Sequence, residues 1–316
     1  MNRLSKDRQA AVVAALVEGN SIRSTVRMTG VAKNTVTKLL VDLGRACDEY
    51  QRRTLIGLKS RRIQCDEIWA FVYAKEKNAS EEMKAAGEAG DVWTWTAIDA
   101  DSKLMVSWLV GGRDAGYATV FMQDVASRLS SRVQVTTDGH KPYLEAVEGA
   151  FGMDVDFAQL VKLYGEAPEG QRRYSPAICT GCKRTPVTGS PDPAHVSTSY
   201  VERQNLTMRM SMRRFTRAVV RGLLRLALVA EFAVGWLRSL LIVVRRGPLT
   251  AIRAEVPSVV SDALPLPIGS RQAAVALHFM FYNFGRVHQS LRVTPAMEAG
   301  VSDHVWTLGE IVSLLD

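Results

Sequence analysis

The sequence predicts an α/β protein in which an all-α N-terminal region precedes a mixed β-sheet flanked by helices. Three observations lead to this fold class. Apolar side chains recur at helical spacing through residues 4–43. From Arg62 onward, segments rich in β-branched and aromatic residues replace that period. Beyond residue 110 these strand-like segments alternate with helical ones, which is typical of a sheet covered by helices.

The composition is that of a globular protein with a polyanionic partner. The chain has 316 residues, 47% of them hydrophobic, which is enough for one large or two small cores. Its net charge is +8, and residues 1–62 contain 13 basic but only 5 acidic residues. Four cysteines are too few for a secreted disulfide framework, and the start MNRLSKDRQ lacks the apolar segment of a signal peptide. We therefore expect a cytoplasmic, nucleoid-associated protein with no membrane partner.

The N-terminal region is expected to be a helix–turn–helix unit. Its three helices are predicted over residues 4–18, 21–29 and 32–43. Ser21 can cap the second helix, and residues 1–50 are interpreted as a DNA-binding domain. The alternative is a plain three-helix bundle with a solvated face. The third helix would present short or cationic side chains to base edges and phosphates, namely Lys33, Asn34, Thr35, Thr37 and Lys38.

A catalytic core is expected over residues 62–217, after a basic connector at 45–62 that contains a linker at 51–61. Its strands are predicted over 62–73, 91–100, 103–110, 133–137 and 155–162, with helices over 115–129 and 140–149. This β-β-β-α-β-α-β order is the one found in ribonuclease-H-like cores. Residues 165–197 are rich in Gly, Pro, Ser and Thr and are expected to form a long functional loop. Residues 198–217 are expected to be helical.

Residues 218–271 differ in character from the rest of the chain and are interpreted as an atypical insertion, irregular over 250–271. Within them, 222–244 is long and apolar but is interrupted by two arginines and a glutamate. Each such residue costs roughly 2.5–3.5 kcal/mol at a bilayer centre, so a buried or partner-facing helix is favoured over a membrane span. A C-terminal helical segment follows over 272–316, beginning with an amphipathic helix at 272–284.

Three carboxylates occur where a metal site would require them. Asp66 lies within the first strand among apolar neighbours, where an unpaired acid is costly. Asp138 ends the fourth strand, and Glu202 lies on the helix after the long loop. Each has an ordinary alternative. Asp66 could pair with an arginine, Asp138 could start an Asp-Gly turn, and Glu202 could be a solvated helix residue.

Carboxylates at such positions suit the chemistry of phosphodiesters. Cutting a DNA strand and joining its 3′-hydroxyl to a new phosphate are in-line displacements at phosphorus. Two Mg²⁺ or Mn²⁺ ions roughly 3.5–4 Å apart can activate the nucleophile and stabilise the leaving oxygen. Mg²⁺ prefers hard oxygen ligands and keeps several waters, so a few carboxylates suffice to hold it. We therefore expect Asp66, Asp138 and Glu202 to be both metal ligands and catalytic residues.

Four segments resemble the IS1 family of insertion-sequence transposases. They are CDEIWAFVYAKEKN, TTDGHKPYL, HVSTSYVERQNLTMRMSMRRFTR and YNFGRVHQSLRVTPAMEAG. The resemblance implies a ribonuclease-H-like core with an Asp–Asp–Glu (DDE) motif, and Asp66, Asp138 and Glu202 fall on the motif positions. It also implies binding to the terminal inverted repeats of an element, DNA transposition by cleavage and strand transfer into target DNA, and a homo-oligomer that brings two DNA ends together.

Two other functions remain open at this point. One is a catalytically inactive DNA-binding regulator derived from a transposase, and the other is a different ribonuclease-H-like nuclease.

Further basic residues fit DNA binding. Arg209, Arg213 and Arg217 repeat every four residues after Arg203 and share one helix face, where they could hold phosphates. The alternative is a solvated basic face with Leu206, Met210 and Phe215 packed inward. His140 and Lys141 could contact the scissile strand or only cap a helix, and Asn205 could orient a metal-bound water or have a structural role. Cys179 and Cys182 form only half a zinc site, so free thiols in a loop are favoured over zinc binding.

Overall fold

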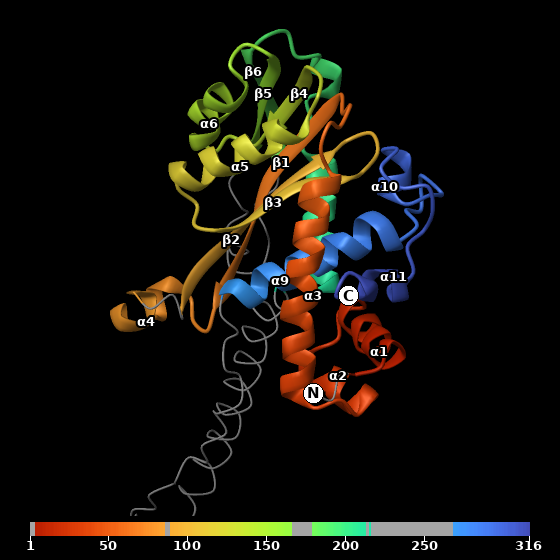
Figure 1. Cartoon of the computed structure of the whole chain (residues 1–316). Helices are drawn as coiled ribbons and strands as arrows, with labels where there is room; N and C mark the ends of the chain where they lie inside the picture. The colour runs from red at the N-terminus through yellow and green to blue at the C-terminus, as the bar shows by residue number, and fades with distance from the viewer. Residues whose placement is uncertain (1–3, 86–88, 166–178, 213–214, 216–267) are drawn as a thin grey trace, which may run out of the picture.

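The computed structural model describes residues 4–85, 89–165, 179–212, 215 and 268–316. The sheet with α5 and α6 lies at one end of the molecule, and α1 and α2 lie at the other (Figure 1). The helices are α1 (Lys6–Val17), α2 (Ile22–Thr29), α3 (Lys33–Thr54), α4 (Glu81–Ala85), α5 (Ala115–Arg128), α6 (Pro142–Phe151), α7 (Ser199–Ser211), α9 (Ile268–Met280), α10 (Pro295–Glu298) and α11 (Leu308–Ser313). The strands are β1 (Arg62–Val72), β2 (Gly90–Asp99), β3 (Met105–Gly111), β4 (Val133–Thr137), β5 (Val155–Tyr164) and β6 (Cys179–Thr188). Shorter turns are η1 (Glu76–Asn78), η2 (Pro193–His195) and the π-helical η3 (Phe281–Gly285).

The predicted mixed sheet is present, with six strands in the order β3-β2-β1-β4-β5-β6. The meander β1-β2-β3 is antiparallel, β4 and β5 run parallel to β1, and β6 closes the far edge antiparallel to β5. This arrangement is compatible with a ribonuclease-H-like fold. The strand β6 corrects the prediction of a loop over 165–197. The polar sequence of β6 and its internal Pro186 are not typical of a strand, so the prediction missed it. The proline is tolerated because β6 is an edge strand, where no further strand needs its N–H.

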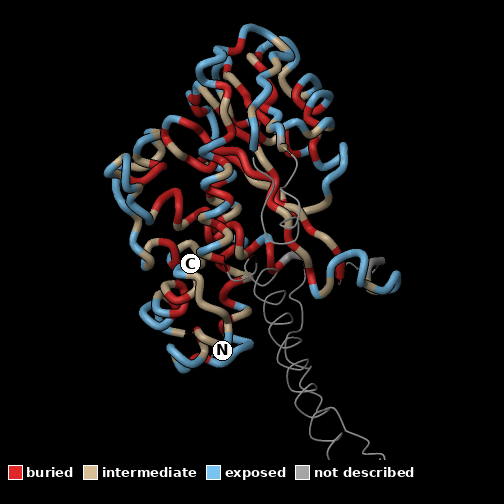
Figure 2. Tube along the Cα trace, turned by 180° about the vertical axis from the view of Figure 1, so that it is seen from behind, coloured by how far each residue is buried: buried red, intermediate tan, exposed pale blue. Residues whose placement is uncertain are grey.

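Successive residues of β1 face opposite sides of the sheet, and each side has its own apolar cluster. Ile63 and Cys65 pack with Phe121 of α5 and residues of α6. Ile68 and Ala70 pack instead with residues of α7 and α9. Buried residues run through the middle of the sheet, between these two helical layers (Figure 2). The sheet is therefore covered on both faces, as expected.

The three N-terminal helices are present, and the Ser21 hydroxyl caps α2 by accepting from the Ser24 N–H over 3.0 Å. The third helix is longer than predicted, because residues 45–54, interpreted as connector, continue α3 to Thr54. The reason is a buried stripe within this charged segment: Cys47 and Gln51 are fully buried, and Gln51 Nε2 donates to the Ala276 carbonyl of α9 over 3.2 Å.

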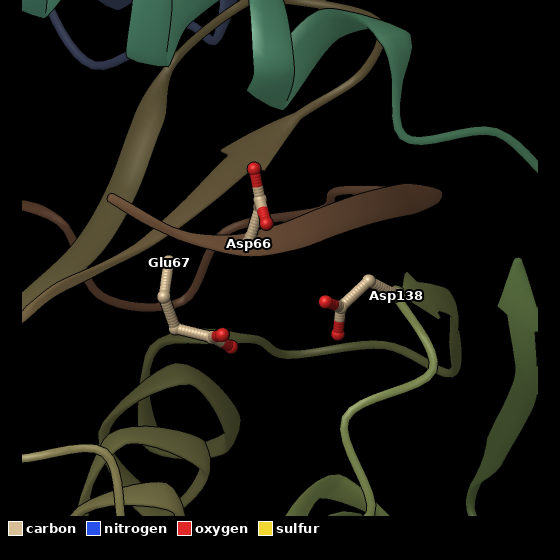
Figure 3. A group of neighbouring side chains, drawn as sticks. All are labelled: Asp66, Glu67 and Asp138. Carbon is tan, nitrogen blue, oxygen red and sulfur yellow. The ribbon is translucent and has the colours of Figure 1, made fainter. Parts of the chain in front are cut away.

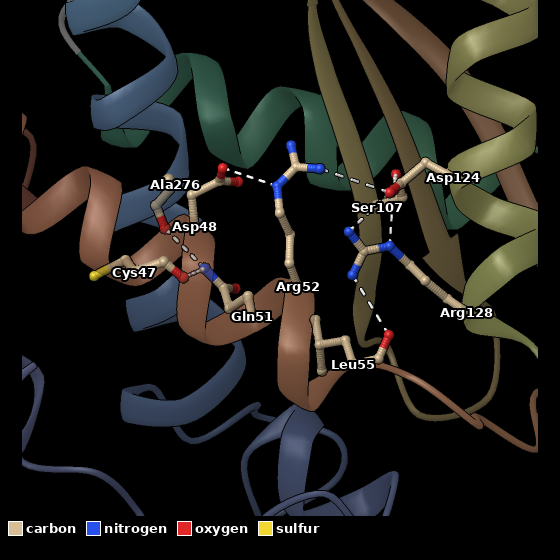
Figure 4. Close-up of polar contacts among 9 residues, drawn as sticks. All are labelled: Cys47, Asp48, Gln51, Arg52, Leu55, Ser107, Asp124, Arg128 and Ala276. Atoms are coloured by element: carbon tan, nitrogen blue, oxygen red, sulfur yellow. Dashed lines mark hydrogen bonds and ion pairs between the residues drawn. The ribbon is translucent and has the colours of Figure 1, made fainter.

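The end of α3 is tied to the sheet rather than left as a free linker. Figure 4 shows Arg128 of α5 donating through Nε to Asp124 over 2.7 Å and through Nη1 to the Leu55 carbonyl over 3.4 Å. Asp124 also accepts from the Ser107 hydroxyl of β3 over 2.5 Å. Leu55 and Leu58 are buried in the cluster that holds the sheet core. Two residues of the expected linker at 51–61 are thus part of the hydrophobic core, while most of the others are exposed.

The C-terminal segment follows the sheet closely. Helix α9 starts at Ile268, four residues before the predicted helix, so the expectation of an irregular chain to residue 271 is corrected there. Asn283 of η3 is fully buried and bonds the Met105 backbone of β3 twice, through Oδ1 over 2.9 Å and Nδ2 over 3.0 Å. Residues 218–267 of the expected insertion, with the apolar segment 222–244, lie outside the described residues. No helix in the described ranges is long and apolar enough to cross a membrane.

Candidate metal and nucleic-acid site

Asp66 and Asp138 lie at the same level on two neighbouring parallel strands. Gln64 of β1 is the register partner of Thr136 of β4, and each aspartate comes two residues later. Strand β4 ends at Thr137, so Asp138 lies just beyond it, beside a part of β1 that β4 no longer pairs with. The two acids predicted from the sequence therefore meet at the carboxyl end of the parallel pair, where α/β proteins place ligand groups.

The Asp66 carboxylate faces α7. Its Oδ2 accepts a hydrogen bond from Asn205 Nδ2 over 2.9 Å, and the Asn205 Oδ1 accepts from the Thr96 hydroxyl of β2 over 3.0 Å. Burial, followed by the charge of Asp138, raises the pKa of Asp66 to about 6. No arginine pairs with it in the described part of the chain. Asn205 thus orients a carboxylate, a role that its spacing from Glu202 alone did not indicate.

Asp138 starts a tight turn as well as facing the site. Its Oδ1 accepts the His140 backbone N–H over 2.9 Å, and its Oδ2 lies 3.8 Å from Arg113 Nη2. A Cβ at Gly139 would lie 2.9 Å from a methyl carbon of Val161 on β5, so glycine allows this close approach. The Asp-Gly turn and the site role are therefore compatible.

Glu202 lies in the first turn of α7, and its carboxylate already has hydrogen-bond partners. Lys162 of β5 donates from Nζ to both carboxylate oxygens, over 2.6 and 2.5 Å, and the Thr198 hydroxyl lies 2.6 Å from Oε1. Glu202 lines one open pocket with Asp66 but not with Asp138, and its charge contributes to the raised pKa of Asp66. The pocket is lined by Asp66, Glu67, Ile68, Glu202, Asn205, Leu206 and Arg209.

Glu67 is an acid at this site that the sequence analysis missed. One carboxylate oxygen each from Asp66, Glu67 and Asp138 lie within 4.8 Å of one another (Figure 3). The Glu67 side chain is only 1% exposed, and its Oε2 accepts from Arg113 Nε over 3.0 Å. Burial chiefly raises its pKa to about 7. The available signal was a second acid directly after Asp66 in an apolar strand.

The predicted DNA-contacting residues lie in two places. Lys33, Asn34, Thr35 and Lys38 are exposed and Thr37 is half-buried at the start of α3, at the opposite end of the molecule from β4 (Figure 1). On α7, Arg203 is exposed and Arg209 lines the pocket.

The α7 face differs from the solvated-face alternative. Leu206 and Met210 are 57% and 74% exposed rather than packed inward, and of the three residues expected inside only Phe215 is buried. Arg213 and Arg217 lie outside the described residues.

His140 and Lys141 follow Asp138 but differ in surroundings. Lys141 is exposed and precedes α6, without a side-chain cap hydrogen bond. The His140 ring packs against Trp95 and Tyr143, and its Nε2 is buried without a hydrogen-bond partner. Burial lowers its pKa. Contact of either residue with DNA stays a prediction.

Cys179 and Cys182 are free and exposed on β6. Among the described residues, the only group of three metal-ligating side chains is formed by Asp66, Glu67 and Asp138, so the structure adds nothing to the zinc half-site.

Comparison with known proteins gives only weak likenesses to solved structures. No protein-family model matches the sequence, and no curated protein matches it significantly. Among solved structures, the piggyBac transposase synaptic complex with hairpin DNA, determined by cryo-EM, is similar at 10% identity and a TM-score of 0.34. The match covers 99% of this chain and 71% of that one.

Proposed function

We propose that the chain is a transposase of the IS1-like type, which cuts and joins DNA at the acidic site. The observation that carries the proposal is the convergence of Asp66, within β1, and Asp138, just past the end of β4, together with Glu202, which lines a pocket with Asp66. Carboxylates brought together in this way repel one another unless cations neutralise them, which is the usual arrangement for phosphodiester chemistry. The resemblance of the surrounding segments to IS1-family transposases points to the same reaction.

The residues present fit divalent metal ions. All the ligand atoms on offer are hard carboxylate oxygens, which Mg²⁺ and Mn²⁺ prefer. Burial first, and then the charge of Asp138, raise the pKa values of Asp66 and Glu67, and the single guanidinium of Arg113 does not balance the three carboxylates. Two such ions, when bound, would activate the attacking oxygen and stabilise the leaving oxygen.

The chain's own residues would position the acids and the substrate. Asn205 holds the Asp66 carboxylate towards the pocket, and the backbone N–H of His140 fixes Asp138. Arg209, on the pocket wall, would neutralise a DNA phosphate beside Asp66 and Glu202. The exposed start of α3 would bind the terminal inverted repeats in a major groove, and pairing of two DNA ends would require a homo-oligomer.

A specific observation favours a second candidate, a DNA-binding regulator without catalysis. Glu202 is held by Lys162 rather than directed at the other two acids, an arrangement that a scaffold without metal could keep. The two candidates differ in what loss of Asp66 or Asp138 would do. A transposase would still bind DNA but lose cleavage, whereas a regulator would keep all of its function.

The test is a cleavage and strand-transfer assay on the DNA that flanks the coding sequence, with Mg²⁺ or Mn²⁺. Asp138→Asn is expected to keep DNA binding and to lose at least about 100-fold in cleavage, equivalent to about 2.7 kcal/mol. The matched control is Asp154→Asn, whose side chain is 79% exposed. Binding without cleavage by the wild type would support the regulator. Cleavage without joining to a target duplex would indicate a simple nuclease.

A further inference from the structure

We propose that Glu67, and not Glu202, completes with Asp66 and Asp138 the site of the divalent ion that the DNA-free protein binds. The inference rests on the proposed function for its metal, but it concerns which side chains hold that metal. It assigns Glu67 a role that the Asp–Asp–Glu pattern leaves out.

The first argument is the position of the three carboxylates. Asp66 and Glu67 are consecutive, so their side chains leave opposite faces of β1. Strand β4 pairs with β1 only as far as Gln64, which leaves the next part of that edge of β1 without a strand partner. Asp138 lies beside this open edge, between the side chains of Asp66 and Glu67 (Figure 3).

The second argument is one of distance. Oxygens bound to one Mg²⁺ lie about 2.1 Å from it, so two of them are about 3 to 4.2 Å apart in octahedral geometry. One oxygen each from Asp66, Glu67 and Asp138 already lie within 4.8 Å of one another. Small side-chain rotations therefore suffice to bring all three onto one ion.

The third argument is independent of the acidic cluster and concerns a buried atom without a partner. Arg113 bonds only Oε2 of Glu67, while Oε1 has no hydrogen-bond partner although the side chain is 1% exposed. The hydroxyl of Tyr143 lies beside Glu67 and lowers its pKa, but the contact falls short of the geometry of an ordinary hydrogen bond. A buried carboxylate oxygen without a partner is costly, and a cation would supply what is missing.

The charges around the three acids do not cancel, so a bound cation would improve the charge balance. Arg113 stacks on the Trp93 ring, 4.6 Å from its centroid, and pairs with Glu67 and more distantly with Asp138. One guanidinium thus stands against three carboxylates. Glu202, in contrast, has both oxygens bonded by Lys162 and would have to give up that pair before binding the same ion.

The experiment titrates Mn²⁺ into the metal-free, full-length protein by calorimetry, without DNA. Glu67→Gln and Asp138→Asn are expected to weaken Mn²⁺ binding at least about tenfold, and Glu202→Gln less than about threefold. Glu148→Gln, on the exposed side of α6, is the matched control. Glutamine keeps the length of the side chain and an oxygen for Arg113, so the fold should survive, and a thermal melt checks this.

A second readout is the number of waters on the bound Mn²⁺, measured by electron paramagnetic resonance with ¹⁷O-labelled water. At saturation, Glu67→Gln should carry one more water than the wild type, whereas Glu202→Gln should carry the same number. Wild-type affinity and hydration in Glu67→Gln would overturn the inference, provided that Asp66→Asn and Asp138→Asn bind weakly. If these two variants also bind Mn²⁺ like the wild type, the proposed metal-dependent function itself fails.

Discussion

The ammonium group of Lys162 on β5 donates to both carboxylate oxygens of Glu202 on α7, over 2.6 and 2.5 Å. The pair links two elements that are far apart in the sequence, and it places a cation beside a predicted metal ligand. Both side chains are about one-third exposed, so the pair adds little to the stability of the fold. Its significance is that it decides whether Glu202 is available to a metal ion.

Replacing Lys162 with methionine should therefore release Glu202. We expect the DNA-free variant Lys162→Met to bind a second equivalent of Mn²⁺, or the same equivalent several-fold more tightly, in a calorimetric titration. Lys6→Met, on α1 at the other end of the molecule from the site, removes the same charge there and should leave binding unchanged. Equal Mn²⁺ stoichiometry and affinity in both variants would show that Lys162 does not compete with the metal.

Asn205 connects Asp66 to Thr96 and should matter for both stability and Mn²⁺ binding. Asn205→Ala removes a buried partner from each of them, with an expected loss of about 1–3 kcal/mol in the free energy of unfolding. Because the amide no longer holds the carboxylate, Mn²⁺ should also bind more weakly. Urea denaturation and calorimetry measure the two effects. Thr207→Ala, which loses only a bond to the Arg203 carbonyl on the same helix, is the control and should change neither.

Much of the fold could be predicted because the spacing of apolar residues that distinguishes helices from strands is a local property of the sequence. The change from helical to strand spacing at Arg62 and the alternation beyond residue 110 gave the order of five strands correctly. The predictions that were wrong concern segments whose secondary structure depends on tertiary contacts. Residues 45–54 look like a charged connector, but they are helical and their buried side pairs with α9 through Gln51. Likewise, the polar strand β6 exists because β5 offers it an edge.

The candidate site divides in the same way. Strand position and hydropathy were enough to single out Asp66 and Asp138, which the register of β1 and β4 brings together. Alternation along a strand argues that Glu67 faces away from Asp66, and only the early end of β4 lets it join them. The Lys162 contact of Glu202 depends on how α7 lies against β5, which no local pattern contains.

Asn283 holds the C-terminal segment against the sheet, and its loss should be costly. Its side chain bonds the N–H and the carbonyl of Met105 and the Gln51 side chain, and it is fully buried. Asn283→Ala leaves these groups buried without partners, so we expect a loss of roughly 2–4 kcal/mol in the free energy of unfolding. The measurement is urea denaturation. Asn78→Ala, at an exposed site, should stay within about 0.5 kcal/mol of the wild type, and a similarly small effect at Asn283 would contradict the bonding described.

His278 of α9 should make the fold sensitive to acid. It is 6% exposed, its Nε2 has no hydrogen-bond partner, and burial followed by the charge of Arg286 lowers its pKa to about 4. A histidine kept neutral in the folded state contributes stability above its unfolded pKa of about 6.5, and this is lost as the pH falls towards 4. The loss is at most about 1.4 kcal/mol per pH unit. Urea denaturation of the wild type and His278→Leu at pH 6.5 and 5 measures it.

Between pH 6.5 and 5, the free energy of unfolding of His278→Leu should fall by up to about 2 kcal/mol less than that of the wild type, since leucine cannot bind a proton. His304 provides a control of opposite sign. Its bonds to Asp303 and Glu310 raise its pKa, so its contribution is present at low pH and is lost as the pH rises. His304→Gln should therefore lose more stability than the wild type on acidification. If His278→Leu and the wild type instead fall in parallel from pH 6.5 to 5, His278 is not the buried neutral group that its surroundings imply.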